Sequence, residues 1–304
     1  MRVVVTGGTG FVGSALAAAL AARGDDVTIL TRGVARELEP AIHAVPWEPT
    51  APGDWQRYVE ESDAVICLAG AGVMDEKWTA ARLEVLRASR IDSTRFVAEA
   101  IARAHAAGRK PVMVSSSAIG IYGMHEDDQK LTESAAHGTD VLAKLCEAWE
   151  AATAPAKDAG ARVPIARLGV VLGPGGALEK MVQPFRAFVG GPLGSGTQML
   201  SWVHLSDAVR ALLFAIDTAH FEGPFNVTAP NAVSMNEIAA GIGKVLHRPA
   251  FLRAPAFAIR AALGERADLV LTGQRAVPAA LLAAGFRFSF ERVGDALADI
   301  LATR

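Results

Sequence analysis

The chain opens with the stretch Val3-Val-Val-Thr-Gly-Gly-Thr-Gly-Phe-Val-Gly13, which leads into Ala- and Leu-rich residues 14–22. An apolar β-branched run that breaks into glycines before such a segment predicts a strand, a phosphate-binding turn and a helix. Gly7 permits a tight turn, Gly10 lets backbone approach a pyrophosphate, and Gly13 allows the helix to pack closely on the strand. The alternative is a glycine-rich turn with no ligand. We expect the dinucleotide here to contact Thr6, Gly7, Gly10, Phe11, Val12 and Gly13.

The next predicted strand, residues 26–31, ends at Thr31 and runs directly into Arg32. A site that prefers NAD places an acidic residue at this point to accept hydrogen bonds from the ribose hydroxyls. Here Thr31 offers a hydroxyl and Arg32 a planar cation suited to a phosphate, with Arg36 as a second cation. A solvated surface arginine is the alternative, and we predict NADP(H) in preference to NAD.

Composition excludes several classes of protein. The 304 residues are 51% hydrophobic with a net charge of −2, so composition favours neither nucleic-acid binding nor attraction to an anionic membrane. The sequence shows neither a bilayer-spanning apolar run nor a signal peptide, and its two cysteines have no metal-ligand spacing. We therefore expect a cytoplasmic protein without a metal, with a small molecule as substrate. A homodimer is left open.

Strands alternate with helices through the first half of the chain. Residues 63–70, 111–117 and 163–172 are predicted to be buried strands, and a long helix is predicted over about 79–107. Such alternation implies right-handed crossovers and a parallel, doubly wound sheet of the Rossmann type, with ligands at the carboxyl ends of the strands. The fold class is therefore α/β.

The composition of the sequence changes at Gly173, where the glycine-rich segment Gly-Pro-Gly-Gly follows the last buried strand. We expect residues 1–172 to form the cofactor-binding domain and 173–304 a smaller α/β region that covers the substrate. Residues 202–216 are expected to return to the larger domain.

The motifs resemble those of the extended, epimerase-like short-chain dehydrogenase/reductases. Thr6–Gly13 matches their TGxxGxxG pattern, and Leu68, Ala69 and Gly70 match a second cofactor-binding turn. The chain is most similar to the atypical, YfcH-like "epimerase family proteins". The segments that carry this narrower resemblance are Lys77-Trp-Thr79, Ser89-Arg90, Cys146-Glu-Ala-Trp-Glu150, Leu271-Thr-Gly-Gln-Arg-Ala-Val-Pro278 and Ala284-Gly-Phe286, whereas Trp202-Val-His-Leu-Ser-Asp207 belongs to the broader epimerase-like resemblance.

The resemblance implies a catalytic Tyr and Lys four residues apart on one helix face, with a Ser opposite them. The only tyrosines are Tyr58 and Tyr122, and Ser62 and Glu126 stand four residues after them. The pair is therefore missing. Ser117, at the end of its strand, can still donate to a substrate oxygen, unless its hydroxyl only bonds local backbone. Tyr122 is the alternative proton donor, unless it is a packed aromatic.

The helix expected over about 140–156 shows what replaces the pair. Matching Trp149-Glu150 to the family places Leu142 at the tyrosine position and Cys146 at the lysine position, while a register that uses Lys144 puts Asp140 at the tyrosine position. Cys146 is a weak candidate acid, because a cysteine buried in a helix is usually inert.

The resemblance alone suggests four substrate contacts, each of which could instead be surface or structural: Lys77, Trp78, Arg90 and His204. Two functions follow from the sequence. One is an NADP(H)-dependent oxidoreductase or epimerase acting on a carbonyl or sugar-nucleotide-like substrate. The other is a dinucleotide-binding sensor or interaction protein without catalysis.

Overall fold

A computed structural model describes residues 1–33, 36–39 and 41–302, with backbone alone at 36–39. The described chain separates into two compact units that interleave along the sequence. Unit 1 contains residues 1–117, 144–167 and 209–224, and unit 2 contains residues 118–143, 168–208 and 225–304. The chain thus divides at several points, with residues 118–143 in the second unit and 209–224 in the first.

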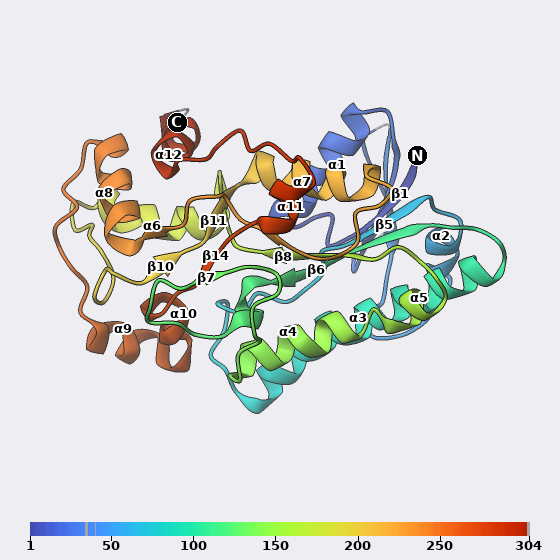
Figure 1. Ribbon diagram of the computed structural model, residues 1–304, viewed down its shortest axis with the longest axis horizontal. Helices are drawn as coiled ribbons and strands as arrows, with labels where there is room; N and C mark the ends of the chain where they lie inside the picture. Colours follow the sequence, from blue (N-terminus) through green and yellow to red (C-terminus); the bar gives the residue numbers. More distant parts are fainter. Residues whose placement is uncertain (34–35, 40, 303–304) are drawn as a thin grey trace. The chain divides into compact units, whose positions relative to one another are not determined.

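Unit 1 is built on a parallel sheet (Figure 1). The strand order is β12-β8-β6-β5-β1-β2-β4-β3, and β3 pairs with β4 in the antiparallel direction at one edge. These strands are β1 (Arg2–Thr6), β2 (Asp26–Thr31), β3 (Arg36–Glu39), β4 (Ile42–Pro46), β5 (Ala64–Cys67), β6 (Val112–Ala118), β8 (Pro164–Leu168) and β12 (Gly223–Val227).

The helices associated with this sheet are α1 (Phe11–Ala22), α2 (Gln56–Glu60), α3 (Ala80–Ala106), α4 (Val141–Ala151), α5 (Ala154–Asp158) and α7 (Leu205–Asp217). Figure 1 shows α1 on one side of the sheet and α3 with α5 on the other. Strand order reverses between β1 and β5, so the turns after these two strands flank a topological switch point. The predicted α/β class and doubly wound sheet are confirmed.

The core of unit 1 explains why these strands form. Val4, Val65 and Met113 stand on neighbouring strands and are at most 2% exposed, packed with Val97 and Ile101 of α3. Strands buried on both faces carry nearly continuous apolar residues, as those of this sheet do.

Unit 2 contains short strands and helices around a second core, in which Trp202, Leu178 and Leu297 pack together. Its elements are η1 (Ile119–Tyr122), β7 (Lys130–Leu131), β9 (Val170–Gly173), α6 (Gly176–Arg186), β10 (Met199–Leu200), β11 (Trp202–His204), β13 (Val233–Ser234), α8 (Met235–Leu246), α9 (Ala256–Leu263), η2 (Gly264–Ala267), α10 (Asp268–Leu271), β14 (Arg275–Ala276), α11 (Ala279–Ala283) and α12 (Val293–Ala302). Across the described ranges, no helix combines the length and apolarity that a bilayer crossing needs.

Candidate functional site

The turn after β1 is shaped by its glycines. Gly7 has φ +69°, and a Cβ there would lie 2.7 Å from the carbonyl carbon of Leu68. A Cβ on Gly13 would lie 2.1 Å from the Gly7 oxygen, so only glycine lets α1 start this close to β1. Gly10 differs, because its φ of −81° suits any residue and its Cβ position meets only the Gly7 oxygen, at 3.1 Å. Gly10 therefore leaves open space rather than serving an unusual backbone angle.

The start of α1 provides hydrogen-bond donors. Gly10 is its N-cap without a side-chain cap, and the Ser14 amide is the first to bond back to the Gly10 oxygen, at 2.9 Å. The amides of Phe11, Val12 and Gly13 have no acceptor within the helix, as at any helix N-terminus. These amides and the helix dipole fit a pyrophosphate group, and the space over Gly10 is the cradle that a side chain would fill.

The turn after β5 lies directly beside this one. The Ala69 amide donates to Thr6 Oγ1 at 3.3 Å, and the Leu68 amide donates to the Thr6 oxygen at 3.1 Å. The expected contacts Thr6, Leu68, Ala69 and Gly70 are thus brought together with the glycine turn, all within unit 1.

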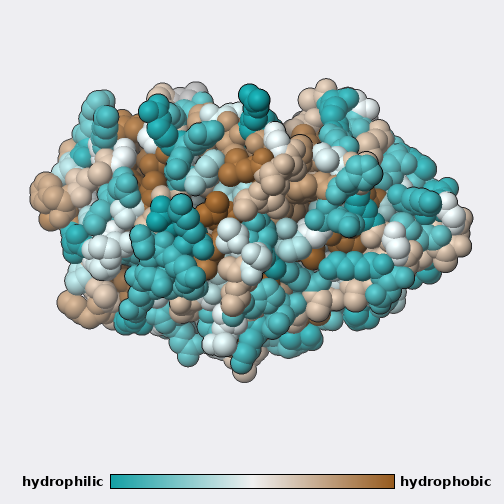
Figure 2. Space-filling view, in the orientation of Figure 1, coloured by the Kyte–Doolittle hydropathy of each residue, from teal (hydrophilic) through white to brown (hydrophobic). Residues whose placement is uncertain are grey.

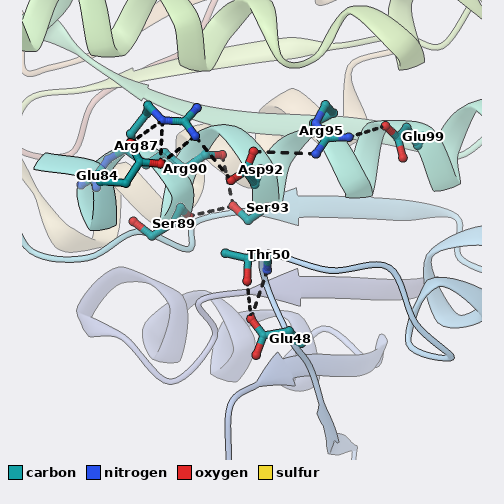
Figure 3. Close-up of polar contacts among 10 residues, drawn as sticks. All are labelled: Glu48, Thr50, Glu84, Arg87, Ser89, Arg90, Asp92, Ser93, Arg95 and Glu99. Carbon is teal, nitrogen blue, oxygen red and sulfur yellow. Dashed lines mark hydrogen bonds and ion pairs between the residues drawn. The ribbon is translucent and has the colours of Figure 1, made fainter. Parts of the chain in front are cut away.

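Arg90, expected as a substrate contact, holds the loop after β5. Its guanidinium donates to the Ala71 oxygen at 2.9 Å and to the Leu86 oxygen at 3.2 Å, and it lies 5.3 Å from the centre of the Trp149 ring. Burial lowers the pKa of Arg90. Ser89 accepts from the Ala71 amide at 3.1 Å. Figure 3 shows both residues on α3 among its charged side chains. Arg90 thus positions the backbone of the loop after β5, which lies next to the glycine turn.

The other two candidates of this region belong to the segment before α3. The Trp78 indole donates to the Val73 oxygen at 2.9 Å, while Lys77 is exposed. Thr79 caps α3 by accepting from the Arg82 amide.

The end of β2 presents Arg32 to solvent. Thr31 Oγ1 accepts from the Gly33 amide at 3.3 Å. Glu48, which sequence reasoning missed, accepts two hydrogen bonds from Thr50 (Figure 3), and these bonds lower its pKa. The positive charge of Arg32 lowers the pKa of Glu48 further. The side chain of Arg36 lies outside the described residues. No acidic residue stands at the end of β2 itself.

Ser117 belongs to a buried polar network. Its hydroxyl donates to Glu150 Oε1 at 2.7 Å, and Arg167 binds both oxygens of that carboxylate, at 2.8 and 2.9 Å. Ser117 is 1% exposed and Arg167 2%. Because its proton is given to a carboxylate, Ser117 can donate to a substrate only by giving up this bond. Sequence reasoning missed Glu150, although an arginine within the apolar strand β8 requires a buried acidic partner.

Tyr122 lies in unit 2, where its hydroxyl donates to Asn226 Oδ1 at 2.7 Å. The Asn226 amide in turn donates to the Leu131 and Val277 oxygens, at 3.3 and 2.9 Å. Tyr122 is 2% exposed and so is a packed aromatic with a bonded hydroxyl.

Helix α4, on which we expected the residues that replace the Tyr and Lys pair, begins at Val141, and Asp140 accepts from the Leu142 and Ala143 amides at 2.9 and 3.0 Å. Asp140 thus caps α4. Cys146 is buried at 5% exposure, near the Arg90 cation. The second cysteine, Cys67, is 4% exposed, and this burial raises the pKa of its thiol to about 12.

His204 ties β11 to the C-terminal elements of unit 2. Its Nδ1 accepts from the Ser206 amide at 3.1 Å, its Nε2 lies 3.2 Å from Asp299 Oδ2, and its ring stacks on Phe290 at 4.0 Å. Burial lowers its pKa, which favours the neutral imidazole. These contacts give His204 a structural role.

The sequence of the chain is similar to a known protein family and to known proteins. Residues 3–228 match the NAD dependent epimerase/dehydratase family, and residues 254–300 match a domain of unknown function, DUF1731. An epimerase family protein of Mycobacterium bovis, Mb2239, is 40% identical over 297 residues, which cover 97% of this chain and 96% of that protein.

Two solved structures resemble the chain at the level of both fold and sequence. The crystal structure of human epimerase family protein SDR39U1 with NADPH has a TM-score of 0.88 and 32% identity, and the match covers 100% of each chain. The nucleoside-diphosphate sugar epimerase from Corynebacterium glutamicum has a TM-score of 0.78 and 34% identity, over 99% of this chain and 58% of that one.

Proposed function

The chain belongs to the NAD dependent epimerase/dehydratase family, whose cofactor is a nicotinamide dinucleotide. We propose that it uses NADP(H) and acts as an oxidoreductase or epimerase. Its proposed substrate is a small carbonyl compound or a molecule that resembles a sugar nucleotide. The observation that carries the preference for NADP(H) is Arg32, exposed at the end of β2 where an acid would favour NAD. A relative solved with NADPH supports the same choice.

Different residues of unit 1 bind different parts of the cofactor. The amides of Phe11, Val12 and Gly13 hold the pyrophosphate, Gly10 leaves room for it, and Arg32 pairs with a phosphate on the ribose. When bound, the cofactor supplies or accepts a hydride. Arg90 contributes indirectly, because it fixes the loop after β5 that borders the glycine turn.

Calorimetry with NADPH and NADH tests the cofactor assignment. We expect NADPH to bind at least about tenfold more tightly, and Arg32→Ala to remove about 1.4 kcal/mol or more of that preference. Arg109→Ala is the matched control, since Arg109 is an exposed arginine that follows α3, near the amino end of β6. Equal affinities of the unmodified protein for the two cofactors would refute the assignment.

A specific observation favours a second function, a dinucleotide-binding sensor. Both expected proton donors are engaged within the protein, Ser117 by the Glu150 carboxylate and Tyr122 by Asn226. A positioned proton donor typically contributes about 10²- to 10⁴-fold to a rate, so general carbonyl substrates should react slowly.

Turnover screening with NADPH and NADP separates the two functions. If the protein is an enzyme, Ser117→Ala should lower kcat/KM at least about tenfold with little change in NADPH affinity, because Ser117 would polarise the substrate and not the cofactor. An active enzyme unaffected by both Ser117→Ala and Tyr122→Phe would show that the acid lies elsewhere. Absence of turnover, together with cofactor-dependent binding of a protein partner, would establish the sensor.

A further inference from the structure

Two segments of unit 2 lie side by side and build one exposed face. The Leu252 amide donates to the Gly190 oxygen at 3.2 Å, and the Ala254 amide donates to the Pro192 oxygen at 3.0 Å. The Arg248 guanidinium lies 4.3 Å from the centre of the Phe188 ring. The chain after α6 and the connection between α8 and α9 are therefore held together.

This face exposes large apolar side chains, which we call the aromatic face: Phe188, Val189, Phe251, Leu252 and Phe257. Their exposed fractions are 56, 56, 76, 44 and 77%. In α9, whose sequence is AFAIRAAL, only Ile259 is buried. In Figure 2, tan side chains lie at the left margin and at the lower left, near the connection before α9 and over α9, with teal and white side chains between them. Apolar residues gathered this way in one region indicate an interaction surface.

The two segments that carry the aromatic face are rich in cations, although the chain as a whole has a net charge of −2 and Glu179, Asp207, Glu237 and Glu265 flank these segments. Residues 238–264 contain no Asp or Glu, and neither do residues 180–206. Acids from outside these stretches neutralise two of the cations: Asp268 pairs with Arg260 at 2.6 Å and Glu179 with Arg186 at 2.9 Å. The remaining cations of these stretches are Lys180, Lys244, Arg248 and Arg253, of which Arg253 donates to the Gly194 and Ser195 oxygens and to Asn236 Oδ1.

The charge pattern selects the kind of partner. In a two-fold dimer through this face, the cation-rich patch of one copy would meet the same patch of the other, and this repulsion disfavours a second copy of the chain. Phenylalanines more than three-quarters exposed, with Arg248 and Arg253 near Phe251 in the sequence, suit the boundary between lipid headgroups and acyl chains, where the rings enter and the cations meet anionic headgroups.

We propose that the aromatic face binds the surface of a bilayer that contains anionic lipid. This binding is peripheral and needs no spanning helix, so it is compatible with the helices observed. It differs from the expectation of no membrane contact, which rested on the net charge of the whole chain and on the lack of a spanning apolar run. Local charge within about a Debye length, about 8 Å in physiological salt, decides such an attraction.

Co-sedimentation with vesicles tests the proposal. We expect the protein to sediment with vesicles of phosphatidylcholine mixed with phosphatidylglycerol and to stay in solution with phosphatidylcholine alone. Phe251→Ser with Phe257→Ser should weaken vesicle binding at least about tenfold, because both rings leave the interface. Lys244→Gln with Arg248→Gln should weaken it about fivefold for each charge removed.

Val85→Ser is the matched control, because Val85 is 48% exposed on α3, in unit 1, and lies outside the aromatic face. This variant should bind vesicles as the unmodified protein does. NADPH affinity and the thermal transition report whether each variant is folded, and Phe257→Ser alone serves if the double variant is not. Failure to sediment with the mixed vesicles would overturn the proposal, as would undiminished binding by the phenylalanine variants. Binding to polyglutamate instead of vesicles would assign the face to an acidic protein, and a dimer lost in these variants would assign it to a second copy.

Discussion

Gly10 and Gly13 stand three residues apart, and replacing each with alanine should separate cofactor binding from folding. At Gly10 the new Cβ meets only one atom within 4 Å, the Gly7 oxygen at 3.1 Å, and the backbone is already extended. The fold should accept it with a change in stability below about 1 kcal/mol. The same methyl group lies where a phosphate would approach the start of α1, so at least one charge-assisted hydrogen bond should be lost. Such a bond is worth about 1.5–3 kcal/mol, which corresponds to an NADPH affinity lowered about tenfold to 150-fold.

Gly13→Ala is the contrasting variant. Its Cβ would lie 2.1 Å from the Gly7 oxygen and 2.8 Å from the Gly8 Cα, both backbone atoms that cannot turn away as a side chain would. Helix α1 must then move from β1, at a cost of about 1–3 kcal/mol. Calorimetry with NADPH and thermal unfolding measure both effects. If Gly10→Ala binds NADPH normally, the cofactor does not lie over this turn. If Gly13→Ala unfolds at the normal temperature, the packing argument is wrong.

Three further results are expected. Glu48→Gln should raise NADPH affinity about two- to fivefold in low salt, because it removes a negative charge beside Arg32. The gain should shrink as salt is added. Calorimetry that shows weaker binding would contradict this. Glu150→Gln should lower the free energy of unfolding in urea by about 3 kcal/mol, since it leaves the Arg167 cation buried without its counter-charge; an unchanged midpoint would show that the pair is dispensable. The pKa of His204 in the folded protein lies below its ordinary 6.5, so as the pH drops the unfolded chain binds the proton first and the free energy of unfolding should fall below about pH 6.5. His204→Gln should flatten that part of the plot of unfolding free energy against pH. A plot of unchanged steepness would argue against this role of His204.

Sequence reasoning was strongest where a local pattern determines the structure. Strand β2 has the predicted bounds, Asp26–Thr31, because an apolar run between Gly24 and Gly33 has few alternatives. Gly7 and Gly13 have the steric roles assigned to them, since both roles follow from the order of strand, turn and helix.

The chemistry of the candidate site was harder to predict, because partners far apart in sequence decide it. Ser117 meets Glu150 across 33 residues, and Tyr122 meets Asn226 across 104. No spacing rule connects such pairs, so the engagement of both hydroxyls was not visible beforehand. The proposed roles of these residues in catalysis therefore stay predictions.

The interleaving of the two units has a consequence for synthesis on the ribosome. The last segment of unit 1 ends at residue 224 of 304, within the strand that completes one edge of its sheet. After the glycine turn, β1 and α1 have left the ribosome, the edge of the sheet at β8 stays unpaired until β12 also emerges. No fragment that stops before this strand can contain the whole dinucleotide-binding sheet. Nascent chains stalled at successive lengths should therefore gain protease resistance in that sheet only after β12 has left the exit tunnel.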